Sequence, residues 1–156
     1  MTACSTGPAM PGSALIAGAA GAVALTTVHQ LGCRAFADAP RMDVLGMRAM
    51  VRLRRAAGIE VPDHATLYRQ TLAGDLLSNA TYYSLVGIGS REGRWARGAA
   101  LGVAAGIGAL VLPRRLGLGD PPASGSVRNQ YLTIAWYLIG GLTTAAVLRA
   151  LDGPED

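Results

Sequence analysis

Charged residues are scarce in this 156-residue chain. They make up 15% of the sequence, while apolar residues make up 51% and the mean hydropathy is +0.31. Soluble domains carry roughly a quarter of their residues as charged side chains. The composition therefore favours one small membrane domain over residues 1–156, with a soluble helical domain rich in Ala and Gly as the alternative.

Cysteine and histidine are also scarce, with two residues of each. Cys4 and Cys33 flank the first apolar segment, so a segment that spans the membrane excludes a disulfide between them. His29 and His64 belong to no group of His, Cys and carboxylate residues with metal-ligand spacing. We expect no metal and no cofactor. A haem or chlorophyll on His29 is the alternative, although a lone membrane histidine is more often a structural residue.

Lysine is absent, and all fourteen basic residues are arginine. A net charge of +4 suits nucleic acid, but these arginines border apolar segments instead of forming one basic face with stacking aromatics. We expect no nucleic-acid partner and interpret the arginines as topology signals and contacts to membrane lipids. Arginine without lysine, in a chain rich in Ala and Gly, is typical of a GC-rich bacterial genome. We therefore expect a multi-pass protein of the bacterial plasma (inner) membrane.

Four apolar segments are the main feature that is present. They are expected over approximately residues 12–31, 70–89, 96–112 and 131–149. The first holds about twenty uncharged residues, the length needed to cross a ~30 Å hydrocarbon core. No basic residue precedes it, which argues against a cleaved signal peptide. The predicted fold is all-α, a polytopic bundle of four transmembrane helices. Pro113, Arg114 and Arg115 are expected to end the third apolar run.

Residues 41–57 predict an amphipathic helix between the first two spans. Its polar face is basic and its other face is largely apolar. Such a helix suits the membrane interface, where arginines contact anionic lipid headgroups. The alternative is a helix packed on the end of the bundle. The expected headgroup contacts are Arg41, Arg48, Arg52 and Arg55.

Glycines recur inside the apolar segments at spacings that bring helices together. Small residues four positions apart let two helix backbones approach closely. A lone bundle of four thin helices leaves some of this surface on its outside. We therefore expect a homo-oligomer or a subunit of a larger membrane complex. The glycines expected in helix packing are Gly18, Gly98, Gly102, Gly106, Gly140 and Gly141.

The second segment is unusually polar for a membrane span. Steps of three or four residues place Tyr68, Thr71 and Asp75 on one helical face with Ser78, Asn79 and Tyr82. Lipid offers such a face no partners, so it is expected to face other helices or water. His29, near the end of the first span, is expected at a depth similar to that of Asp75. The predicted polar intramembrane cluster is His29, Asp75, Ser78, Asn79 and Tyr82.

Three functions follow from these features. The favoured one is a non-enzymatic structural or assembly protein that packs with itself or with a larger membrane complex. The second is a small proton-coupled transporter that uses Asp75. The third is an enzyme acting on lipid headgroups at the cytoplasmic interface, with His29 and Asp75 as acid and base. No Ser/His/Asp nucleophile pattern and no complete Gly-rich phosphate loop is visible, so no catalytic residue is assigned.

The arginine distribution predicts the topology. Ten of the fourteen arginines lie in or beside the first and third connections, so by the positive-inside rule these are cytoplasmic and both termini lie outside. Reporter fusions at Gly153 and within residues 41–55 should therefore report opposite sides of the membrane. An external 41–55 segment would contradict the prediction.

Overall fold

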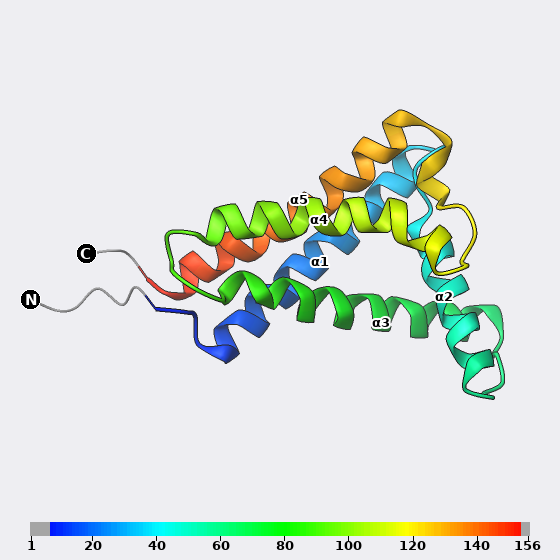
Figure 1. The fold of residues 1–156 in the computed structure, drawn as a ribbon, viewed down its shortest axis with the longest axis horizontal. Coiled ribbons are helices and arrows are strands. Elements are labelled where there is room, and N and C mark those ends of the chain that lie inside the picture. Colours follow the sequence, from blue (N-terminus) through cyan, green and yellow to red (C-terminus); the bar gives the residue numbers. More distant parts are fainter. Residues whose placement is uncertain (1–6, 154–156) are drawn as a thin grey trace, which may run out of the picture.

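The computed structural model describes residues 7–153, which are helical with no strand (Figure 1). This confirms the predicted all-α class. Two short 3₁₀ helices, η1 (Leu85–Gly87) and η2 (Pro122–Gly125), lie in the connections. The α-helices are α1 (Pro11–Ala35), α2 (Met42–Ala56), α3 (His64–Ser84), α4 (Arg94–Arg115) and α5 (Val127–Leu151).

The four long helices form a bundle, and α2 lies crosswise at one end of it (Figure 1). α1 packs against both α3 and α5, and α5 packs in turn against α4. α3 makes few contacts with α4 or α5. α1 is therefore held between α3 and α5.

Three of the described helices, α1, α4 and α5, are long and apolar enough to cross a membrane. α3 is not among them, although its 21 residues give it sufficient length. Arg69, Asp75 and Asn79 lower its hydropathy. Length and composition therefore support three spans, and the predicted count of four is not confirmed.

α3 occupies different residues from those expected for the second span, since it begins at His64 and ends at Ser84. Its start is set by Asp63, whose carboxylate accepts hydrogen bonds from the backbone N–H groups of Ala65 and Thr66 at 3.0 and 3.1 Å. The hydrogen bonds from Thr66 and Ala65 lower the pKa of Asp63. η1 replaces the last turn that the sequence predicted.

α4 includes Pro113 and ends at Arg115, within the three residues expected to end the third apolar run. A proline removes its own N–H and disturbs the carbonyl four residues earlier, but it leaves later residues free to remain helical. α4 therefore ends at Arg115. The backbone N–H of Leu118 then donates to the Pro113 carbonyl at 2.8 Å. At its other end α4 begins at Arg94, so Trp95 adds length to the span.

α4 and α5 meet backbone to backbone through the glycines of α4. A Cβ atom added to Gly102 would lie 2.7 Å from the Cα of Leu138, and one added to Gly106 would lie 2.7 Å from the Cα of Ile134. Real Cβ contacts essentially never fall below 3.0 Å, so only glycine fits at this helix separation. Gly98 lies in the same way against the Gly141 carbonyl.

The remaining predicted packing glycines also lie against this chain's own helices. Gly18 faces the Ala80 carbonyl of α3, Gly140 faces a tyrosine of α3, and Gly141 faces the Gly98 carbonyl of α4. The glycine surface predicted to lie partly on the outside of the bundle thus packs within one chain. It no longer supports an oligomer.

Gly102 and Gly108 offer a matched pair on α4. A Cβ at Gly108 would meet only Leu112 Cδ1 at an ordinary 3.5 Å, so Gly108→Ala should gain helix propensity, about 0.5–1 kcal/mol. Gly102→Ala should instead lower the free energy of unfolding by about 1–3 kcal/mol, because α4 and α5 must separate. Unfolding in mild detergent by added SDS measures both. Equal effects would contradict the glycine contact.

Candidate functional site

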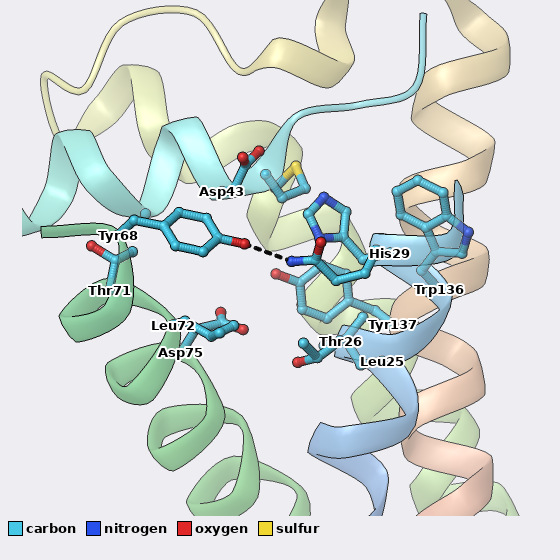
Figure 2. Close-up of a pocket in the computed structure, with 13 residues that line it drawn as sticks. Leu25, Thr26, His29, Asp43, Tyr68, Thr71, Leu72, Asp75, Trp136 and Tyr137 are labelled. Carbon is cyan, nitrogen blue, oxygen red and sulfur yellow. Dashed lines mark hydrogen bonds between the residues drawn. The ribbon is translucent and has the colours of Figure 1, made fainter. Parts of the chain in front are cut away.

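A cavity of about 50 Å³ lies between α1, α2, α3 and α5 (Figure 2). Trp136 and Leu25 supply part of its apolar wall. Its volume suffices for about three water molecules or one partly hydrated monovalent cation. The polar lining comes from Thr26, His29 and Gln30 of α1, Asp43 of α2, Tyr68, Thr71 and Asp75 of α3, and Tyr137 of α5.

Asp75 extends from α3 toward α1 in this cavity (Figure 2). Asn79 Nδ2 donates to Asp75 Oδ1 at 2.9 Å and to the Asp75 backbone carbonyl at 3.0 Å. Within residues 7–153 the carboxylate has no ion pair and no other hydrogen bond. Its charge is therefore not neutralised by a neighbouring side chain.

His29 lines the same cavity without a hydrogen bond to Asp75. Its Nε2 lies 3.2 Å from the Pro40 carbonyl oxygen and 3.4 Å from Cys33 Sγ. Its ring meets the Trp136 ring edge to face, with centroids 5.4 Å apart. His29 and Asp75 thus line one cavity, but the imidazole contacts Pro40, Cys33 and Trp136 instead of Asp75.

Two hydroxyl groups in the lining have no partner among the described residues. Thr26 Oγ1 and Thr71 Oγ1 are both buried and make no hydrogen bond there. Buried polar groups are nearly always hydrogen-bonded, to the protein or to a bound water or ion. Figure 2 shows the Thr26 hydroxyl directed into the space between α1 and α3. A polar occupant of the cavity would satisfy it.

Gln30 and Tyr68 bridge α1 and α3 beside the cavity. Gln30 Nε2 donates to the Tyr68 hydroxyl at 2.9 Å, the bond drawn in Figure 2. Tyr68 belongs to the polar helical face predicted from the sequence, but neither Gln30 nor Tyr68 is part of the predicted cluster. Which side chains pair between two helices depends on how the helices are rotated relative to each other. Residue spacing within one helix does not predict that rotation.

Arg41, expected at lipid headgroups, pairs with Asp43 of the cavity lining. Arg41 donates through Nε at 3.0 Å and through Nη2 at 2.7 Å to the two carboxylate oxygens. Burial raises the pKa of Asp43, but the hydrogen bond and the charge of Arg41 outweigh it and hold that pKa below its usual range. The Asp43 carboxylate is therefore ionised, and the guanidinium group of Arg41 balances its charge.

Ser78 and Tyr82 do not line the cavity, whereas His29 and Asp75 of the same predicted cluster do. Ser78 is exposed, and its Oγ donates to the Asp75 backbone carbonyl at 3.1 Å. The Tyr82 hydroxyl donates to the Leu101 carbonyl of α4 at 3.0 Å. Ser78 thus bonds within its own helix, and Tyr82 ties α3 to α4.

The other three arginines of the predicted headgroup face border a second, open pocket. Arg48 Nη1 donates to the Asp120 carbonyl and Arg52 Nη1 to the Gly117 carbonyl, each at 3.1 Å. Arg55 is exposed, and no hydrogen bond of its side chain is found within residues 7–153. α2 is therefore fastened to the segment that follows α4.

A buried ion-pair cluster at the other end of the bundle was missed. The Arg94 side chain is 1% exposed, pairs with the Asp152 carboxylate and donates to the Leu148 carbonyl at 3.4 Å. Arg91 donates to the same carboxylate at 3.0 Å and to the Asp152 carbonyl at 2.7 Å. The sequence features that could have predicted this cluster are the basic loop before α4 and the acidic residues after α5.

Searches for known relatives add no assignment. No protein-family model matches the chain, and no curated protein or solved structure matches it either. Within residues 7–153, no group of three or more His, Cys, Asp or Glu side chains is placed to hold a metal ion. The geometry of the cavity is therefore the basis for inferring a function.

The buried ion pair can be tested against an exposed one. Asp152→Asn leaves the buried Arg94 charge without its counter-charge and should lower the free energy of unfolding by about 3 kcal/mol. Asp120→Asn removes a pair with Arg114 whose side chains are 74% and 64% exposed, and should cost under about 1 kcal/mol. Unfolding in mild detergent compares them. Equal losses would contradict a structural role for the buried pair.

Proposed function

We propose that this chain is a four-span protein of the bacterial plasma membrane that binds a proton or a monovalent cation in the cavity. Asp75 supplies the negative charge, as in a small proton- or cation-coupled carrier. One observation carries the proposal. An exposed carboxylate with no ion pair within the described residues lines the same cavity as two buried hydroxyls that lack partners there.

The charge of Asp75 argues for a cationic occupant. An isolated carboxylate inside a membrane bundle is costly, and protonation or a bound cation removes that cost. Oxygen ligands suit hard cations. Figure 2 shows the Asp75 carboxylate on the α3 side of the cavity and the hydroxyl groups of Thr26 and Tyr137 on the α1 side, so oxygens of several groups surround one space.

Hydrogen bonds within α3 support its inclusion as the fourth span. Ser78, Thr81 and Ser84 each donate to a carbonyl three or four residues earlier, at 2.7–3.1 Å. These bonds reduce the cost of facing lipid with a hydroxyl. At about 1.5 Å per residue, the 21 residues of α3 reach the thickness of the hydrocarbon core. Leu77, 71% exposed, suits contact with acyl chains.

The other two functions have less support. The assembly function relied on glycine surfaces outside the bundle, and those glycines pack within the chain. The headgroup enzyme requires arginines that hold phosphate near His29 and Asp75. Arg48, Arg52 and Arg55 instead line the second pocket, which shares no lining residue with the cavity.

Trp136 provides a direct test of cavity occupancy. It lines the cavity against His29, whereas Trp95 is distant in sequence and 42% exposed. In a Trp95→Phe background, Trp136 emission should change with pH or with added Na⁺ or K⁺. Choline, which is too large for the cavity, should have no effect. Asp75→Asn should fold normally and lose the response, because an amide carries no charge and does not titrate.

Ser78→Ala is the matched control. It changes a polar residue on the outer face of α3 and should keep the full response. A response that survives Asp75→Asn would overturn the cation site. Unchanged emission in every condition from the Trp95→Phe protein that keeps Asp75, together with a normally folded Asp75→Asn protein and an unfolded Asp75→Leu protein, would assign Asp75 a purely structural role.

A further inference from the structure

The pocket beside α2 has two chemically different parts. It is open, has a volume of about 540 Å³ and lies between α2, the start of α3 and the segment after α4. Val44, Val51 and Leu67 give it an apolar floor. Arg48, Arg52 and Arg55 give it a basic rim. A ligand that fills it needs both an anionic group and apolar carbon.

The basic rim keeps hydrogen-bonding capacity for an anion. Arg48 and Arg52 each use Nη1 for a loop carbonyl, and a guanidinium group has several further N–H donors. Arg55 makes no side-chain hydrogen bond within the described residues. No carboxylate lines the pocket. The nearby Asp120 carboxylate accepts from Arg114 at 2.6 Å. The rim is therefore positive and suits bidentate contacts to phosphate.

The position of α2 identifies the source of the anion. α2 lies crosswise at the end of the bundle where α1 ends and α5 begins, both of them helices apolar enough to span (Figure 1). A crosswise helix there lies at the depth of the lipid headgroups. Free phosphate would leave the apolar floor uncovered. An anionic phospholipid matches both parts of the pocket and is present at that depth.

We infer that this pocket binds one anionic phospholipid, with its phosphate on Arg52 and Arg55 and its first acyl carbons on the floor formed by Val44, Val51 and Leu67. The inference requires only that the bundle lies in a membrane. It goes beyond the proposed cation site and does not depend on Asp75, so either can fail alone.

Lipid titration with native mass spectrometry tests the inference on the full-length protein in mild detergent. Dioleoyl phosphatidylglycerol should bind as one molecule, and dioleoyl phosphatidylcholine should bind at least about tenfold more weakly. Arg52→Gln/Arg55→Gln should weaken phosphatidylglycerol binding by about tenfold or more. The matched control is Arg34→Gln/Arg69→Gln, which removes two exposed arginines outside the pocket and should keep the affinity within about twofold.

Arg52 also fastens the segment after α4, so Arg55→Gln alone provides a second variant. Within residues 7–153 it breaks no side-chain hydrogen bond or ion pair, and it should still weaken phosphatidylglycerol binding by about threefold or more. Equal losses in the two double variants would overturn the site in favour of general surface attraction. Equal binding of phosphatidylcholine would overturn the role of the rim. Displacement of the lipid by millimolar inorganic phosphate would overturn the role of the acyl chains.

Discussion

Close contact between helix backbones is the constraint on which the rest of this bundle depends. Lipid gives two apolar helices little hydrophobic reason to associate, so packing must hold them. Gly18 of α1 lies against the Ala80 carbonyl of α3. From this crossing the two helices diverge toward α2, and the cavity with His29 and Asp75 lies where they have separated (Figure 1). One close contact thus fixes where a polar space forms.

Much of the fold follows from local sequence properties. Three apolar runs are long enough to span, and glycine spacing marked Gly102 and Gly106 for helix packing. The partner of each glycine was not predictable, because small residues at the right spacing suit a second copy of the chain as well as another helix of the same chain. The prediction of an oligomer rested on this ambiguity.

The candidate site was predictable only in part, for a similar reason. Helical spacing puts Asp75, Ser78 and Tyr82 on one face, and the polarity of that face was evident. The rotation of α3 against α1 decides which of them reaches the cavity, and the length of the tyrosine side chain carries Tyr82 to α4 instead. The Arg94–Asp152 pair joins residues that are far apart in the sequence, so no local pattern contains it.

The contact of α1 with α5 has a consequence for the order of biosynthesis. Among the described α-helices, α1 emerges first from the ribosome and α5 last, yet Gly21 of α1 lies against the Gly140 carbonyl and the Thr144 side chain of α5. Until α5 has been synthesised, that face of α1 lacks the helix on which it packs in the described bundle. α1 and α3 can pair early, whereas the joining of α1 to α5 is the closing step. A chain truncated before α5 therefore exposes a packing face that membrane quality control can recognise.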